Sequence, residues 1–100
     1  MPLVLFLNPS FKKCLNKLGA DQKIIVAIIL ETLQIYYNFN CDLERARDNA
    51  PGFFYKQLRK PYYEAGVERN IRVVLEKNGS VCTAILAGNH DQIKKFLKIV

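Results

Sequence analysis

The sequence is poor in residues that bind metals. It contains one histidine and three cysteines, Cys14, Cys41 and Cys82, and no two of the cysteines stand at the spacing of metal ligands. Three cysteines cannot all pair within one chain, so we expect reduced thiols, with Cys14 and Cys82 as small core residues. The sequence therefore predicts no structural zinc site, no other metal site and no cofactor.

Long hydrophobic runs are also missing. The longest apolar cluster, IIVAIIL at 24–30, lies between Lys23 and Glu31 and is too short to span a bilayer. The first residues, MPLVLFLNPSFKK, have neither the basic start nor the small-residue cleavage site of a signal peptide. We therefore expect a cytoplasmic protein without a membrane partner.

The motifs of several common enzyme classes are absent. There is no glycine-rich phosphate loop, no carboxylate cluster suited to magnesium, and no serine or cysteine nucleophile beside the histidine. Metal-independent RNA cleavage stays open, because the 2′-OH of the RNA is itself the nucleophile. The protein then supplies only a base, an acid and cationic stabilisation.

The charge that is present is positive and unevenly distributed. The 100 residues carry 15 Lys and Arg against 9 Asp and Glu, a formal net charge of +6. Residues 1–50 hold six basic and five acidic side chains, whereas residues 51–100 hold nine and four. Such an excess favours a polyanion or an acidic protein as partner, and a solubilising surface charge explains it equally well.

The first half of the chain predicts a strand followed by a helical hairpin. Residues 3–7 form a short apolar run typical of a buried strand. Asn8, followed by proline, marks the start of a helix that Gly19 ends, and Asp21 is expected to cap a second helix that reaches about Tyr37. The predicted apolar stripe of this second helix comprises Ile25, Ile28, Ile29, Leu33 and Tyr36.

The second half predicts an antiparallel sheet and a short helix. The polar stretch 38–52 ends in Pro-Gly and is expected to be a loop with room for one helical turn. An Asn-Gly hairpin turn and a final helix from Asn89 are also expected. The predicted strands cover 62–67, 71–77 and 81–88. The whole is predicted to be a small single-domain α+β fold over residues 1–100: an N-terminal strand at a sheet edge or beside the last strand, a helical hairpin, a three-stranded antiparallel sheet and a short C-terminal helix.

The single histidine, His90, lies at the start of the last predicted helix. Asn89 and Gln92 form a relaxed capping box, which places His90 at the first helical position. Free backbone N–H groups at such a position bind anions, and histidine is the usual acid/base side chain near neutral pH. From chemistry alone, an exposed helix-start residue without a catalytic role is the simpler interpretation.

Arg72 is the second candidate for chemistry. It alternates with apolar neighbours in the strand 71–77, so it is expected on the open face of the sheet. There a guanidinium suits a phosphate and can stabilise charge on a phosphoryl group. A surface arginine paired with Glu64 or Glu76 of a neighbouring strand is the alternative.

The segment 53–63, FFYKQLRKPYY, interleaves aromatic rings with Lys56, Arg59 and Lys60. Aromatic faces stack on unpaired bases while cations follow the phosphates, as single-stranded RNA binding requires. In a chain of this size several of these rings must instead belong to the core.

The order of elements, together with the segment from Gln57 to Leu97, resembles the RelE/ParE superfamily of bacterial toxins from type II toxin–antitoxin systems. The matching pieces are KQL at 56–58, YYEAGV, IRVVLEK and AILAGNH. The likeness in architecture covers nearly the whole chain. The sequence departs from the superfamily at Ala65, where a basic residue is common, and at Asp91, which replaces a tyrosine next to the histidine. The carboxylate that some members use before the second strand has no clear match in FFYKQL.

Members of the RelE branch are ribosome-dependent endoribonucleases that cut mRNA in the ribosomal A site. A small antitoxin neutralises them, and the complex usually represses its own operon. The resemblance implies the same metal-independent mRNA interferase activity here, with a cognate antitoxin and ribosome-bound mRNA as partners. It assigns catalysis to His90 and Arg72. The residues expected to bind RNA or phosphate are Lys56, Arg59, Arg69, Lys94, Lys95 and Phe96.

Two alternatives and the state of assembly stay open. The ParE branch keeps the fold, inhibits DNA gyrase and lacks the ribonuclease residues, and the departures at Ala65 and Asp91 keep that function in play. A non-catalytic basic domain of the same fold, binding RNA or protein, is the other. His90 favours the ribonuclease, since gyrase inhibitors have no need of it. The assembly is left open between a homodimer and a hetero-oligomer with the antitoxin.

Overall fold

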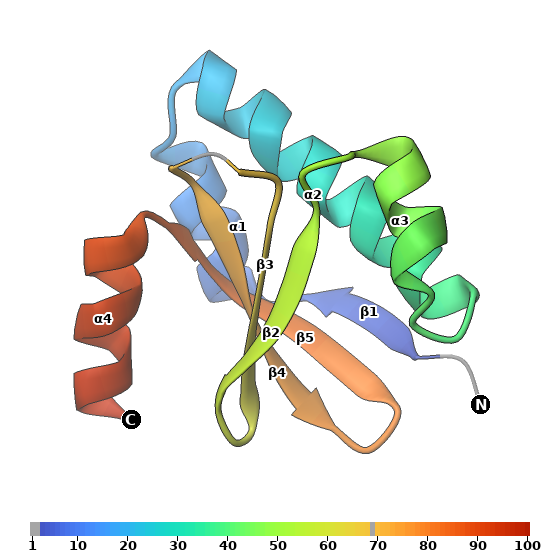
Figure 1. Cartoon of the computed structure of the whole chain (residues 1–100). Coiled ribbons are helices and arrows are strands. Elements are labelled where there is room, and N and C mark those ends of the chain that lie inside the picture. Colours follow the sequence, from blue (N-terminus) through green and yellow to red (C-terminus); the bar gives the residue numbers. More distant parts are fainter. Residues whose placement is uncertain (1–2, 69) are drawn as a thin grey trace.

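The computed structural model describes residues 3–68 and 70–100. Its elements in chain order are β1 (Val4–Leu7), α1 (Pro9–Asn16), α2 (Ala20–Asn38), α3 (Leu43–Asn49), β2 (Phe54–Arg59), β3 (Tyr62–Gly66), β4 (Arg72–Asn78), β5 (Val81–Gly88) and α4 (His90–Ile99). The strands form a five-stranded sheet in the order β1-β5-β4-β3-β2 (Figure 1). β1 runs parallel to β5, and every other neighbouring pair is antiparallel. The predicted α+β fold is confirmed, with β1 at an edge of the sheet beside the last strand.

Two elements correct the sequence prediction, which has a loop over 38–52 and a three-stranded antiparallel sheet. The predicted loop contains α3, which starts because the Asp42 side chain accepts hydrogen bonds from the N–H groups of Glu44 and Arg45, at 3.0 and 3.3 Å. Only Ala46 of α3 is buried, so the sequence of this helix has no apolar stripe from which it could be predicted. The second element, β2, forms by pairing along β3 and brings the antiparallel part of the sheet to four strands.

The start and the buried face of α2 also differ from prediction. The helix begins after Gly19, two residues before the expected cap at Asp21. Ile28, expected in the apolar stripe, is 40% exposed. The helix is apolar nearly all round, so its periodicity does not decide which face packs on the sheet. Its buried residues are Val26, Ile29, Thr32, Leu33 and Tyr37. In the part of the chain described here, no helix has both the length and the apolar character that crossing a bilayer requires.

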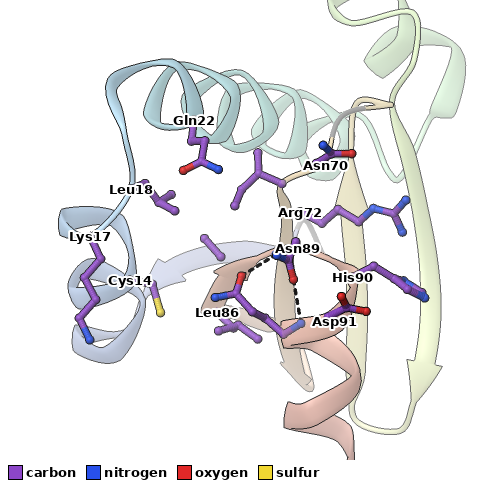
Figure 2. Close-up of a pocket in the computed structure, with 13 residues that line it drawn as sticks. Cys14, Lys17, Leu18, Gln22, Asn70, Arg72, Leu86, Asn89, His90 and Asp91 are labelled. Carbon is purple, nitrogen blue, oxygen red and sulfur yellow. Dashed lines mark hydrogen bonds between the residues drawn. The ribbon is translucent and has the colours of Figure 1, made fainter.

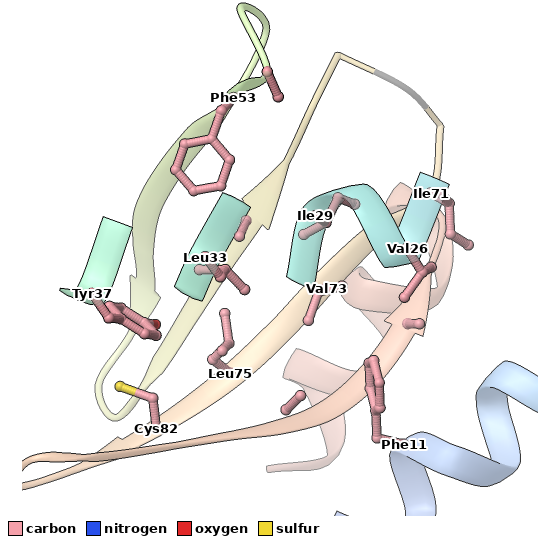
Figure 3. Close-up of a cluster of buried hydrophobic side chains, with 14 of the residues drawn as sticks. Phe11, Val26, Ile29, Leu33, Tyr37, Phe53, Ile71, Val73, Leu75 and Cys82 are labelled. Carbon is pink, nitrogen blue, oxygen red and sulfur yellow. The ribbon is translucent and has the colours of Figure 1, made fainter. Parts of the chain in front are cut away.

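The main core lies between the helices α1 and α2 and one face of the sheet. Ile29 and Leu33 of α2 lie over Val73 and Leu75 of β4 (Figure 3), and all four side chains are fully buried or nearly so. Phe11 of α1 closes the core at one end. Cys82 is buried and Cys14 is half-buried against this core, as predicted, and Cys41 is exposed.

Helix α4 covers part of the opposite face of the sheet. Val74 alternates with Val73 and Leu75, so it points to that face, and it is nevertheless fully buried. On the same face, the ring of Tyr62 on β3 meets the ring of Phe96 on α4 edge-on, with 5.1 Å between their centroids. The second face is thus half covered, and its uncovered end carries the candidate site.

Candidate active site

The sheet brings the two predicted catalytic residues to the same end of the fold. Arg72 is the first residue of β4 and pairs in register with Gly88, the last residue of β5. His90 begins α4 two residues later. Figure 2 shows both side chains extending to the same side, away from Lys17. Their proximity follows from the β4–β5 hairpin.

The capping box predicted at the start of α4 is present and fixes the position of His90. Asn89 Oδ1 accepts the N–H of Gln92 at 2.9 Å, and Gln92 Oε1 accepts the N–H of Asn89 at 2.8 Å. A Cβ atom at Gly88 would lie 2.7 Å from Gln92 Oε1, so glycine leaves room for the returning side chain. His90 is therefore an exposed residue at the first position of a well-capped helix.

Arg72 is held by a buried carboxylate. Glu64 is 1% exposed, yet it sits on the open face of the sheet, between two cations. Arg72 Nη1 donates to Glu64 Oε1 at 3.2 Å, and Lys56 Nζ lies 3.2 Å from Oε2. The ion pair between Arg72 and Glu64, expected as the alternative to phosphate binding, is therefore present in the structure. This pairing does not neutralise the site, because Arg72 and Lys56 share the single carboxylate of Glu64 and one net positive charge remains.

The ring of Phe54 lies against the same two cations. Its centroid is 5.2 Å from Cζ of Arg72 and 5.9 Å from Nζ of Lys56, distances that suit cation–π attraction. Phe54 stands opposite Gly66 in register, where a Cβ atom would come within 2.7 Å of the ring. Phe54 and Glu64 are site residues that sequence reasoning does not assign. The sequence feature that could have identified Glu64 as a site residue is its position on a predicted strand whose two neighbouring strands carry basic residues.

A cleft of about 700 Å³ adjoins Arg72 and His90. It lies between the α1–α2 connection on one side and the start of α4 on the other (Figure 2). Its walls mix apolar side chains with amides and cations. Its lining includes Lys17, Leu18, Gln22, Leu86, Asn89 and Gln92. Among the described residues, no group of three or more histidines, cysteines and carboxylates is arranged to hold a metal ion.

Comparison with known proteins gives matches in structure only. No protein-family model and no curated protein matches the sequence. RelE in the RelB–RelE antitoxin–toxin complex of Methanococcus jannaschii matches with a TM-score of 0.63 at 17% identity, over 91% of this chain and 96% of that one. The toxin chain of the E. coli DinJ–YafQ complex matches with a TM-score of 0.64 at 12% identity, over 93% and 98%. The chain has the fold of RelE-type toxins.

A third toxin structure matches over a similar extent. A copper-bound mutant toxin from Helicobacter pylori gives a TM-score of 0.52 at 20% identity, over 93% of this chain and 99% of that one. All three likenesses run along nearly the whole of both chains, so they establish the RelE-type fold as a unit. At identities of this size the chemistry must be argued from the residues of this chain.

Arg59, which is predicted to bind phosphate, has two partners within the protein. Its Nη2 group donates to the main-chain oxygens of Leu97 and Val100, at the C-terminal end of α4. A cation there also meets the negative end of the helix dipole. Arg59 therefore fastens α4 to β2, and Phe96 adds the contact with Tyr62 described above.

The remaining predicted binding residues are lysines of α4 and one arginine. Lys94 and Lys95 are exposed. Lys94 lies four residues after His90 and hence on the same side of the helix. Arg69 lies outside the described residues.

The strongest pKa perturbations lie elsewhere, among tyrosines packed against the main core. Burial raises the pKa of Tyr37 and Tyr55, whose hydroxyl groups are hydrogen-bonded at 2.9 Å, and raises the pKa of Tyr36 to about 12. Burial also raises the pKa of the Cys82 thiol. These groups are kept neutral by the core, so we interpret them as structural.

Proposed function

We propose that this chain is the toxin of a type II toxin–antitoxin system and acts in the cytoplasm as a metal-independent endoribonuclease on ribosome-bound mRNA. The fold supports the toxin part, because the matched RelE and YafQ chains are toxins in complexes with the antitoxins RelB and DinJ. By the same likeness, a cognate antitoxin is the proposed protein partner. The observation that carries the enzymatic part is the placement of His90 beside an anchored Arg72 at the open end of the sheet.

The proposed reaction needs no group beyond those of the protein and the RNA. The 2′-oxygen attacks the adjacent phosphorus while a base removes its proton, and the bond from phosphorus to the 5′-oxygen breaks as an acid protonates that oxygen. The products are a 2′,3′-cyclic phosphate and a 5′-hydroxyl. We assign one of the two proton transfers to His90, and stabilisation of the extra negative charge on the phosphoryl oxygens to Arg72.

The cations around the site are proposed to hold the RNA backbone. Lys56 is 54% exposed while it pairs with Glu64, so it can also reach a phosphate. Lys94 and Lys95 extend this positive surface along α4. Phe54, with both cations against its ring, is placed to stack on an unpaired base.

Induced expression with primer extension on a reporter mRNA tests the proposal. We expect growth arrest with translation-dependent cuts, and loss of both in His90→Ala and Arg72→Ala proteins that remain folded by circular dichroism. Positioned proton transfer contributes roughly 10²–10⁴-fold, so residual cutting in His90→Ala should fall at least about 100-fold. Lys12→Ala, an exposed lysine of α1, is the control and should behave as wild type.

Other outcomes decide against the ribonuclease. Arrest with intact mRNA in both the wild type and His90→Ala would refute it and favour the ParE-like inhibition of gyrase. Cutting that survives His90→Ala but is lost when Lys56 is reversed to glutamate would support the non-catalytic binding domain, with the nuclease activity belonging to another protein.

A further inference from the structure

Two glutamines in the cleft have their oxygen atoms engaged by the backbone. Gln22 Oε1 accepts the N–H of Gly19 at 3.3 Å at the start of α2. Gln92 Oε1 accepts the N–H of Asn89 at 2.8 Å at the start of α4. No hydrogen bond within the described part of the chain engages the Nε2 group of either glutamine. Both glutamines line the cleft, and each has two amide N–H donors that the described residues do not use.

The neighbouring polar groups add further donors. Asn89 Oδ1 is bound to the N–H of Gln92, which leaves its amide N–H₂ group. Lys17 lines the far side of the cleft, across from Arg72, as Figure 2 shows. The lining also holds acceptors, namely the carboxylate of Asp91 next to His90 and the side-chain oxygen of Asn70. Helix capping thus uses the acceptors at both helix starts and leaves a wall rich in donors.

The remaining lining residues are apolar. Leu18 and Leu86 line the cleft between the polar groups. A volume of about 700 Å³ lies within the range of roughly 300–1,000 Å³ of small-molecule sites. Apolar walls with a few directed polar groups are the usual construction of a small-molecule site.

We propose that this cleft binds a nucleobase of the RNA and selects keto bases, guanine and uracil, over amino bases, adenine and cytosine. The inference rests on the proposed function only in taking RNA as the natural ligand. Guanine presents N7 and O6 as acceptors, and the O4 of uracil is an acceptor as well. Adenine and cytosine place an amino donor at the corresponding edge. In this cleft that amino group would face Gln22, Gln92 and Asn89, donor against donor.

The matched variants are Gln22→Glu and Gln92→Glu. Glutamate at the third position of a helix keeps the capping acceptor, as in a capping box, and replaces the free N–H₂ group by an oxygen acceptor. Each variant therefore changes the hydrogen-bonding character of the wall without removing the helix cap. Gln34→Glu, at an exposed position of α2, introduces the same charge outside the cleft and is the control.

The experiment is an NMR titration of the whole ¹⁵N-labelled chain with the four nucleoside 5′-monophosphates. We expect GMP and UMP to bind about fivefold more tightly than AMP and CMP, the lower end of the discrimination that base-edge contacts provide. The side-chain amide signals of Gln22, Gln92 and Asn89 should shift. Gln22→Glu and Gln92→Glu should abolish or reverse the preference, and Gln34→Glu should retain it.

Several outcomes would overturn the proposal. They are equal affinity for the four nucleotides, no binding of any of them at millimolar concentration, and shifts confined to residues outside the cleft. The titration needs neither the ribosome nor cleavage, so it separates the two proposals. If the chain prefers keto bases but cuts no mRNA, the base-selection proposal is supported and the ribonuclease proposal is refuted. If it cuts mRNA but shows no base preference in the titration, the ribonuclease proposal is supported and the base-selection proposal is refuted.

Discussion

Glu64→Gln removes a single charge from the centre of the candidate site and nearly preserves its shape. The carboxylate is 1% exposed and faces Arg72 and Lys56, each at 3.2 Å. Breaking a buried ion pair from one side costs about 3–5 kcal/mol. Here the side chains of Arg72 and Lys56 are 26% and 54% exposed, so water replaces part of what they lose. We therefore expect the free energy of unfolding to fall by about 2 kcal/mol.

Urea unfolding followed by circular dichroism measures this change. For a domain of this size, each kcal/mol lost from the free energy of unfolding lowers the melting temperature by roughly 4–8 °C, so the melting temperature should fall by roughly 8–16 °C. Glu76→Gln makes the same substitution on β4, at a glutamate that has no ion pair among the described residues. It should change the free energy of unfolding by less than about 0.5 kcal/mol.

A double variant isolates the interaction itself. Arg72→Met alone leaves Glu64 with only Lys56, whereas Glu64→Gln with Arg72→Met leaves neither buried charge. The combined loss should be smaller than the sum of the single losses, because the second substitution removes a charge that the first left without its partner. Strict additivity, or a Glu64→Gln protein as stable as Glu76→Gln, would show that the carboxylate does not hold Arg72.

Three further predictions concern single contacts. Gly66→Ala places a Cβ atom 2.7 Å from the Phe54 ring and should cost about 1–3 kcal/mol in thermal unfolding. Adding Phe54→Leu should recover part of this loss. No recovery would show that the loss does not come from a clash with the Phe54 ring. Asn89→Ala removes the acceptor for the Gln92 N–H and should cost about 1 kcal/mol in urea, whereas Asn89→Asp should retain the cap. Equal losses in the two variants would count against the cap. Burial raises the pKa of Tyr37 above its usual 10.0. The unfolded chain therefore loses that proton first, so the contribution of Tyr37 to stability should be constant below about pH 9 and fall above pH 10, by up to about 1.4 kcal/mol per pH unit. Tyr37→Phe should show a shallower fall, and an identical pH profile would contradict the assignment.

Local signals account for the parts of the fold that the sequence predicts. Asn8 before proline, the glycine turn after Asn78 and the Asn89–Gln92 capping box each act within a few residues. All three are present in the structure, the turn with Gly79 and Ser80 between the paired residues Asn78 and Val81. The position of His90 depends on such a signal and was therefore predictable. The face of Arg72 follows from strand alternation and was predictable for the same reason.

Long-range contacts account for what sequence reasoning misses. β2 is a strand because it pairs with β3, and its residues carry no clean alternation of apolar and polar side chains. The Arg59 guanidinium meets the end of α4, 38 and 41 residues further along the chain. The burial of Glu64 depends on cations from two different strands. None of these contacts has a local signature, because each depends on which segments the fold places side by side.

The parallel pairing of β1 with β5 determines when the sheet can be completed during synthesis. β1 lies at the sheet edge and Val4 pairs with Val81, so the first strand has no partner until residues 81–88 leave the ribosome. At about 5–20 residues per second that delay is roughly 4–15 s. Gly88 and His90 emerge together with the end of β5. The candidate site therefore cannot assemble before β5 and the start of α4 have been translated.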